Sequence, residues 1–389
     1  MIYLDNAAST QIHEDVLNSM LPYLKEQYGN ASSIHRYGRL AHKAIEKARK
    51  QIASLINADP SEILITSGGT ESNNTVLRGI SANKTCNHII TSSIEHDAIL
   101  EPCKQLAKDG LIVDYLPVDK FGMVDTLELQ NRISENTCLV SIMFGNNEVG
   151  TVQKISEITK ICHDRKIPFH TDAVQAVGKI PIDVKELGID LLSISSHKLH
   201  GPKGIGALYI KNGIKIDPVI LGGGQEHGLR SGTENVANIV GFGKACEIAK
   251  NNLHENMSYV KKLRDLLVDN ILSEIPEVTL NGDPQSRLPN NAHFTFLGVN
   301  GEDLIIKLDE YGIAASTGSA CSVNTQKASH VLEAMGFSHE QITGSLRLTL
   351  GIFNQEKEIK ETVDSLKKIV EELRSFSPFK EKYSFTSKS

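Results

Sequence analysis

Apolar residues in the first two thirds of the chain form short runs that alternate with helix-like segments. Residues 39–56 carry apolar side chains at helical spacing with charges opposite, which predicts an amphipathic helix that packs on a sheet. These positions are Leu40, Ala44, Ala48, Ile52 and Leu55. The runs lie at 63–66, 88–93, 111–118, 138–144, 167–173 and 191–195. Strands that alternate with helices favour an α/β fold with a mainly parallel sheet covered on both faces.

The pattern changes from about residue 250 onward. A long charged helix is predicted over residues 251–272, followed by an apolar run at 293–298. A closing helix has its apolar positions in register at Ile359, Val363, Leu366, Ile369 and Leu373. This mixture of helix and strand predicts a second, smaller α+β domain.

The composition is that of an ordinary globular protein and excludes several functional classes. The chain has 389 residues, 40% of them hydrophobic and 23% charged, and a formal net charge of -6. Because no basic tract stands out, direct binding of nucleic acid is not expected. The sequence shows neither a signal peptide nor an apolar run of the ~18 residues that a membrane helix needs. We therefore expect a cytoplasmic protein without membrane contacts.

The six cysteines are scattered and contain no C-x-x-C pair, so their spacing is not that of a zinc site or of a small disulfide scaffold. Five lie in apolar or helical segments and are predicted to be small buried hydrophobic residues: Cys86, Cys103, Cys138, Cys162 and Cys246. Cys321 differs because it lies in STGSACSVNTQ, a loop rich in Gly, Ser and Asn.

Polar residues follow several of the predicted strands, where ligands bind in parallel sheets. The turn SGGTESNN after residues 63–66 opens a helix whose N-terminus suits a phosphate, although a plain strand-to-helix turn is the favoured explanation of this turn when it is taken alone. Neither a Walker loop nor G-x-G-x-x-G occurs at any strand-helix junction. His96, Asn147, Asp172 and Gln175 follow later runs. Each alone has an ordinary structural explanation, such as a helix N-cap or a turn, but their joint position indicates a binding site.

The run at 191–195 leads into SSHKLHGPKG, which contains Lys198 and Lys203. A lysine at such a place forms a Schiff base when burial and nearby positive charge favour its neutral amine. An aspartate such as Asp172 would pair with a pyridinium nitrogen and keep that ring an electron sink. Together with the turn SGGTESNN, whose backbone N–H groups suit a phosphate, these residues suggest pyridoxal 5'-phosphate. The alternative of a metal pair at His197 and His200 lacks nearby cysteine or carboxylate ligands.

The sequence resembles the fold-type-I pyridoxal-phosphate enzymes and, within them, the class I cysteine desulfurases of the NifS and IscS type. The resemblance runs from residue 3 almost to the C-terminus. It rests on the motifs YLDNAAST, GNASSIH, TSGGTESNN, EHDA, NNEVG, HTDAVQAVGK, SSHKLHGPKGIGALY, LRSGTEN, STGSACS, SHVLEAMG and SLRLTLG. It implies a large domain of residues 16–255 and a small domain of residues 1–15 and 256–389, which carries the cysteine loop at about 316–330.

The resemblance also implies a role for each matching residue, with no metal in the active site. Lys198 is the expected Schiff-base lysine, which leaves Lys203 a structural or surface residue. The cofactor-binding residues implied are Lys198, Gly69, Thr70, His96, Asn147, Asp172, Gln175, Ser195, His197 and Thr233, the last reaching the phosphate of the other subunit in a homodimer. Arg347, assisted by Asn147, is expected to bind the substrate carboxylate.

The implied reaction removes sulfur from L-cysteine, releases alanine and leaves a persulfide on Cys321, with Lys198 and His96 moving protons. The persulfide would then pass to an iron-sulfur scaffold or another acceptor protein, for cluster assembly or tRNA thiolation. The alternatives are a selenocysteine lyase, a sulfur donor for DNA phosphorothioation, and a non-catalytic sulfur-assembly subunit. The chain departs from the family after the cysteine, where SVNTQKASHVL replaces the more usual acidic-proline pair.

Overall fold

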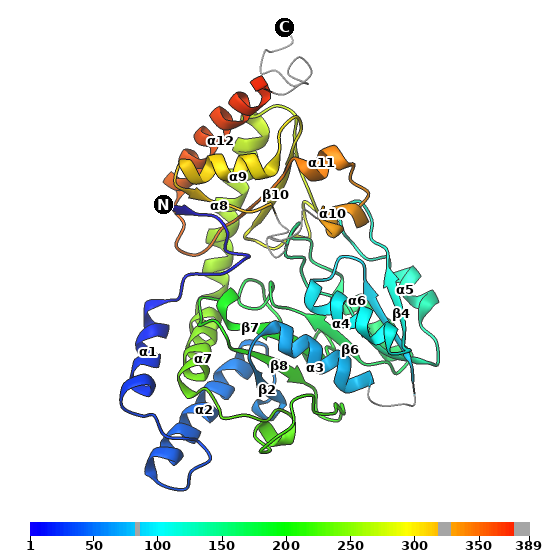
Figure 1. Ribbon diagram of the computed structural model, residues 1–389, viewed down its shortest axis with the longest axis vertical. Coiled ribbons are helices and arrows are strands. Elements are labelled where there is room, and N and C mark those ends of the chain that lie inside the picture. Colours follow the sequence, from blue (N-terminus) through cyan, green and yellow to red (C-terminus); the bar gives the residue numbers. More distant parts are fainter. Residues whose placement is uncertain (82–85, 318–327, 377–389) are drawn as a thin grey trace.

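The computed structural model describes residues 1–81, 86–317 and 328–376. A broad sheet covered by helices forms the lower part of the molecule, and a smaller group of helices on a short sheet forms the upper part (Figure 1). The long helix α8 (Leu253–Glu274) rises from the lower part into the upper one and begins directly after α7 (Val236–Asn251).

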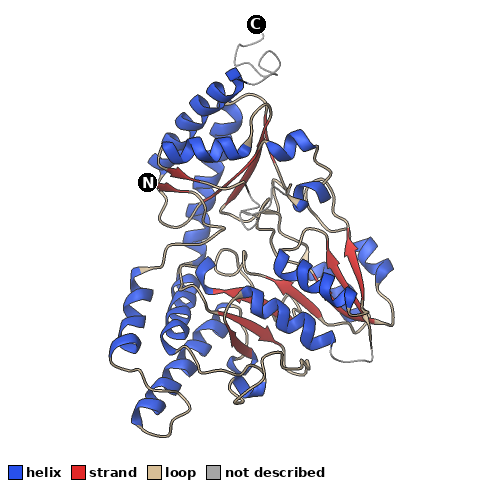
Figure 2. Cartoon of the chain, viewed as in Figure 1, coloured by secondary structure: helices blue, strands red, loops and turns tan. Residues whose placement is uncertain are grey.

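The large sheet has seven strands in the order β2-β8-β7-β6-β5-β3-β4. Figure 2 shows strands of this sheet in red in the lower part of the molecule, with blue helices around them. Its strands are β2 (Ile63–Thr66), β3 (His88–Ser92), β4 (Ile112–Leu116), β5 (Thr137–Ser141), β6 (Phe169–Asp172), β7 (Leu191–Ser195) and β8 (Gly206–Ile210). All neighbouring pairs are parallel except those of β8, which runs antiparallel to β2 and to β7. The predicted mainly parallel α/β sheet is confirmed, and the antiparallel strand β8 is an addition to it.

Successive side chains of the strands face two different helical layers. Ile63 and Ile65 of β2 belong to one hydrophobic core, whereas Leu64 between them belongs to another. The first core is completed mainly by α1 (Glu14–Lys25), α2 (Arg36–Leu55), α5 (Thr126–Arg132), α6 (Ile155–Asp164) and α7, and the second by α3 (Gly69–Ser81) and α4 (Asp97–Lys108). Both faces are therefore buried, which explains the continuous apolar runs.

Helix α2 confirms the amphipathic helix expected at residues 39–56, with one correction. Its apolar face packs along α7 as well as on the sheet. Leu40, which the pattern assigned to that face, is 40% exposed. The buried positions begin instead at Gly38 and Ala41, on either side of Leu40.

The smaller part is built on the antiparallel strands β9 (Val278–Leu280), β10 (Asn291–Phe296) and β12 (Ser345–Thr349) and on the parallel pair β1 (Ile2–Tyr3) and β11 (Ile313–Ala314). Helices α8, α9 (Gly301–Glu310) and α12 (Glu356–Phe376) share one hydrophobic core with these strands and with Leu4. The short helices α10 (His330–Ala334) and α11 (His339–Thr343) instead contribute to a cluster with Ile94, Met143 and Val149 of the larger part.

The prediction that five cysteines are separate buried residues is wrong for two of them. Cys86 and Cys138 form a disulfide, with their Cα atoms 5.5 Å apart, so they are not separate buried thiols. Cys103, Cys162 and Cys246 are free and buried, as expected. Burial raises the pKa of the Cys103 and Cys162 thiols to about 12, which leaves them unreactive at neutral pH. Cys321 lies outside the described residues. Within the described ranges, none of the helices is both long and apolar enough to span a membrane.

Candidate active site

The strand order brings the predicted polar residues to one edge of the large sheet. Strands β7, β6, β5 and β3 are consecutive neighbours and end toward the same side. Lys198 follows β7, Asp172 ends β6, Asn147 follows β5 and His96 follows β3. Residues separated by up to about a hundred positions are thus gathered along the carboxyl edge, as expected for a ligand site in such a sheet.

Backbone carbonyls of the N-terminal segment lie against this edge. The Lys198 ammonium Nζ donates to the carbonyl oxygens of Ala7 at 2.5 Å and Ala8 at 2.7 Å. Gln175 Nε2 donates to the same Ala7 oxygen at 2.9 Å. Thr10 N in turn donates to the His197 carbonyl at 3.0 Å. The motif YLDNAAST therefore contributes its main chain, a role that residue types alone did not reveal.

The Asp172 carboxylate is buried and held in one orientation. Asn73 Nδ2 donates to its Oδ2 at 2.7 Å, and the backbone N–H of Val174 donates to its Oδ1 at 3.0 Å. Asn73 belongs to TSGGTESNN, but its role was not predicted from the sequence. These two donors fix the carboxylate in place, so that it can accept a hydrogen bond from a protonated ring nitrogen.

The turn before α3 provides a close approach to backbone N–H groups. Gly68 has a φ of 152°, and the helix begins at Gly69 with Thr70 exposed in its first turn. A Cβ on Gly69 would lie 2.7 Å from Val174 Cγ2, so a larger residue here would have to displace the Val174 side chain on the loop after β6. The N–H groups of a first helical turn have no acceptor within their helix and suit a phosphate.

Two further predicted phosphate ligands flank this turn. Ser195 ends β7, and its Oγ lies 3.9 Å from the position that a Cβ on Gly68 would occupy. His197 Nδ1 lies 3.2 Å from Ser9 Oγ. Burial, with the cations Lys198, Lys203 and Lys179, lowers the pKa of His197 to about 4. The ring is therefore neutral at physiological pH and keeps a single N–H to donate.

His96 is the N-cap of α4 and has a defined tautomer. Its Nδ1 accepts a hydrogen bond from the backbone N–H of Ala98 at 3.0 Å. A neutral ring that accepts at Nδ1 carries its proton on Nε2. The α4 N-terminus thus fixes which nitrogen of this half-buried ring is available as a donor.

Arg347 enters the site from β12 of the smaller part. Its Nη1 donates to the carbonyl oxygen of Asn147 at 2.9 Å, and its Nη2 forms an ion pair with Asp5 Oδ1 at 2.9 Å. The contact to Asn147 uses that residue's main chain. Asp5 was not predicted as a partner at all, because the two residues lie 342 positions apart.

We expect Asp5→Asn to lower the free energy of unfolding by about 2 kcal/mol, because a buried guanidinium then loses this carboxylate. The Arg347 side chain is 3% exposed and that of Asp5 is 19% exposed, so water replaces the lost carboxylate poorly. Urea denaturation of the two proteins measures the difference.

Glu101→Gln is the matched control, because it removes a carboxylate from the fully hydrated pair with Lys104. Its effect should stay below about 0.5 kcal/mol. Equal destabilisation by the two substitutions would contradict a specific role for the Asp5 contact.

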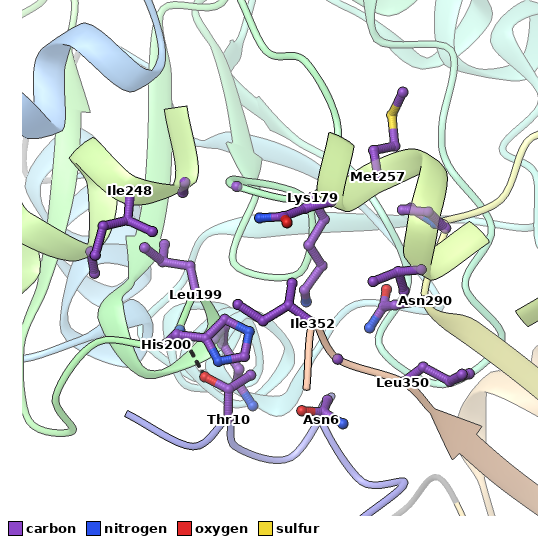
Figure 3. Close-up of a pocket in the computed structure, with 18 of the residues that line it drawn as sticks. Asn6, Thr10, Lys179, Leu199, His200, Ile248, Met257, Asn290, Leu350 and Ile352 are labelled. Atoms are coloured by element: carbon purple, nitrogen blue, oxygen red, sulfur yellow. Dashed lines mark hydrogen bonds between the residues drawn. The ribbon is translucent and has the colours of Figure 1, made fainter. Parts of the chain in front are cut away.

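Lys198 lines a cavity of about 50 Å³. Lys179 and His200 line it from the larger part of the molecule, and Asn6, Asn290 and Leu350 line it from the smaller part (Figure 3). The cavity shows that Lys198 lies where the two parts of the molecule meet.

Two of the predicted site residues are not placed at this edge by the structure. Thr233 is exposed on the loop before α7. That loop is attached to the larger part by ion pairs from Arg230 to Glu71 at 2.9 Å and from Glu226 to Arg49 at 2.7 Å. Cys321 lies outside the described residues, so its distance from Lys198 is not defined.

Comparison with known proteins agrees with this geometry. Residues 2–362 match the family described as Aminotransferase class-V. The chain belongs to the class-V aminotransferase family. It is 48% identical over 390 residues to the cysteine desulfurase IscS of Dictyoglomus turgidum, with 100% of this chain and 99% of that protein covered. The resemblance to the NifS and IscS group is thereby confirmed.

Solved structures of class-V aminotransferase relatives share the fold. A NifS-like protein superposes with a TM-score of 0.90 at 40% sequence identity, covering 95% of this chain and 99% of that one. A structure of SspA in complex with cysteine superposes with a TM-score of 0.82 at 36% identity, covering 91% of this chain and 100% of that one. The fold-type-I architecture expected from the sequence is therefore confirmed.

The donor set at the edge fits pyridoxal 5'-phosphate, the cofactor on which this family depends. Lys198 and Asp172 supply an amine and a fixed carboxylate at the ends of the neighbouring strands β7 and β6, and Gly69 at the N-terminus of α3 lies beside Val174 and Ser195. These groups match the aldehyde, the ring nitrogen and the phosphate in chemical type. No cluster of three or more possible metal ligands occurs in residues 1–81, 86–317 and 328–376.

Proposed function

We propose that this protein is a pyridoxal-phosphate-dependent cysteine desulfurase, which converts L-cysteine to L-alanine and leaves the sulfur as a persulfide on Cys321. The observation that carries the proposal is the gathering of Lys198, Asp172 and His96 at consecutive strand ends, with Arg347 bonded to Asn147 at the same edge. A lysine, an acid and a carboxylate-binding arginine are what carbanion chemistry on an amino acid requires.

Within this proposal, the chain's own residues hold the cofactor by its two ends. Asp172 would accept a hydrogen bond from the protonated ring nitrogen, with Asn73 and Val174 keeping the carboxylate in place. The N-terminus of α3 at Gly69 and Thr70 would bind the phosphate, together with Ser195 and His197. Gln175 would donate to the phenolic oxygen, and His96 would cover the ring. When bound, pyridoxal phosphate supplies a ring that withdraws electrons from the substrate Cα.

Substrate binding and proton transfer fall to Arg347 and Lys198. The Arg347 guanidinium is a planar fork of donors, which suits a carboxylate, and its contacts to Asp5 and the Asn147 main chain hold it at this edge. The substrate carboxylate would bind to Arg347, with Asn147 alongside. The neutral Lys198 amine would then remove the Cα proton and hold it at Nζ.

Sulfur transfer is assigned to Cys321. Its thiolate forms a bond to the substrate sulfur while the bond between that sulfur and Cβ breaks, and the electron pair of the broken bond stays with the substrate carbon. That carbon is then protonated and alanine leaves. The persulfide sulfur on Cys321 can pass to a thiol of an acceptor protein by the same exchange.

The remaining assignments are parts of the same proposal. Residues 16–255 would form the cofactor domain, and residues 1–15 with 256–389 the domain that carries the cysteine loop. Thr233 would reach the phosphate of a second subunit in a homodimer. The acceptor would be an iron-sulfur scaffold or a tRNA-thiolation protein in the cytoplasm. The class-V family membership and the resemblance to NifS and IscS support these assignments.

The activity assay is direct. The purified protein, loaded with pyridoxal phosphate and given L-cysteine and a thiol reductant, should release alanine and sulfide in equal amounts, because each turnover breaks one carbon-sulfur bond. L-Serine is the matched control, since it has the same carboxylate and amine but no sulfur to transfer. Pyruvate in place of alanine would point to a lyase of another type and would refute the proposal.

A further inference from the structure

Lys179 is joined to Lys198 by a chain of hydrogen bonds. Lys179 Nζ donates to Gln175 Oε1 at 3.1 Å, and Gln175 Nε2 donates to the Ala7 carbonyl at 2.9 Å. Lys198 Nζ donates to the same Ala7 carbonyl at 2.5 Å. Lys179 closes the motif HTDAVQAVGK, but neither the sequence pattern nor the proposed mechanism gives it a role.

The chain of bonds has a fixed direction. A protonated lysine has donors only, whereas a glutamine amide has an acceptor at one end and donors at the other. When protonated, Lys179 therefore holds Gln175 with its oxygen toward Lys179 and its NH₂ group toward Ala7. Without this contact the Gln175 amide could flip, and either its oxygen or its NH₂ group could then face the proposed cofactor site.

Lys179 also adds positive charge to the surroundings of Lys198. Both lysines line the same cavity, together with His13 and His200, and no carboxylate occurs among the described residues that line it (Figure 3). Burial, and then the cations Lys198 and Arg347, lower the pKa of Lys179 to about 7. Like charges that share a poorly hydrated site favour the neutral form of each.

Lys179 also influences the imidazoles of His197 and His200, which lie in the turn that contains Lys198. It contributes to the lowered pKa of His197 and of His200, although burial is the largest cause for both. Lys179 thus acts on three residues assigned to the cofactor, which are Gln175, Lys198 and His197.

We propose that Lys179 is a positioning residue for the cofactor lysine, which orients the Gln175 amide and favours the neutral amine of Lys198 through its positive charge. The inference rests on the proposed function, because it takes Lys198 and Gln175 as cofactor residues. It concerns a residue to which the proposed function assigns no contact with substrate or cofactor.

The first test uses the protein without cofactor. Reductive methylation of Lys198 is followed by mass spectrometry as a function of pH, since only the neutral amine reacts. Lys179→Met should raise the pH midpoint of this reaction by about one unit, because one positive charge beside Lys198 is lost. Lys179→Arg keeps a charge and donors and should stay close to the wild-type midpoint. Lys185→Met, which removes an exposed lysine paired with Asp59, is the control and should change nothing.

The second test uses the cofactor-loaded protein without substrate. The pH midpoint of the cofactor's absorption change should move in Lys179→Met in the same direction as in the methylation experiment, and Lys179→Arg should restore it. A change in thermal stability alone, with both midpoints within about 0.2 units of wild type, would show a merely structural role and overturn the inference. An equal shift in Lys185→Met would overturn it as well.

Failure of the proposed function would give a different result. A protein that binds no pyridoxal phosphate shows no absorption band in any variant, whereas methylation of Lys198 still reports the influence of Lys179. Should Lys179→Met not fold, Lys179→Gln removes the same charge while retaining a polar side chain, and the same two midpoints decide.

Discussion

Lys198→Ala should abolish the visible absorption band of bound cofactor and lower the release of alanine from L-cysteine by about 10³-fold or more. The alanine side chain has no amine to bond the cofactor and none to remove the Cα proton, so binding and chemistry are lost together. Absorption spectra with added pyridoxal phosphate and a single-turnover alanine assay measure the two effects separately.

Lys203→Ala is the matched control, because Lys203 lies five residues further on in the same motif and is exposed. It should keep both the band and the turnover. The opposite outcome, a silent Lys198→Ala and an inactive Lys203→Ala, would reassign the cofactor lysine and contradict the position of Lys198 at the strand edge.

Cys321→Ala should lower sulfide release from L-cysteine by at least about 10³-fold while leaving the cofactor band intact. The substitution removes the only thiol proposed to attack the substrate sulfur, but it leaves Lys198, Asp172 and the phosphate turn unchanged. Mass spectrometry after one turnover should show the addition of one sulfur to the wild-type peptide that contains Cys321, and no addition in the variant.

Cys162→Ala provides the comparison, since this thiol is buried on α6 with its pKa raised to about 12. It should form the persulfide on Cys321 at the wild-type rate. Sulfide release by Cys321→Ala at an undiminished rate would exclude a persulfide on this residue and leave a simple lyase.

The helices and strands of the larger part were predicted well because both faces of its sheet are buried. Residues 63–66 and 191–195 coincide with β2 and β7, since a strand covered on both sides is apolar throughout. Strand β8 was not predicted as part of the sheet. It follows the lysine turn directly, and it starts at Gly206, where a Cβ would lie 2.5 Å from the Ile194 carbonyl.

The disulfide shows a different limit of sequence reasoning. Cys86 and Cys138 are separated by 52 positions and resemble ordinary apolar positions. Their pairing depends on the parallel alignment of β3 and β5, which brings His88 opposite Thr137. The spacing of cysteines in the sequence does not indicate which strands pair, so it could not predict this disulfide.

The sequence by itself determined the fold class, the positions of the strand ends and the identity of the residues that follow them. This was possible because periodicity and strand-end chemistry are local properties of the chain, and because the motifs match a known family closely. Contacts between distant segments were decided only by the tertiary structure. Asp5 pairs with Arg347, and Ala7 accepts from both Gln175 and Lys198, because β11 and β12 of the smaller part hold the N-terminal segment against the sheet edge. Main-chain carbonyls and distant charges leave no pattern in the sequence, yet here they orient the lysine to which the reaction is assigned.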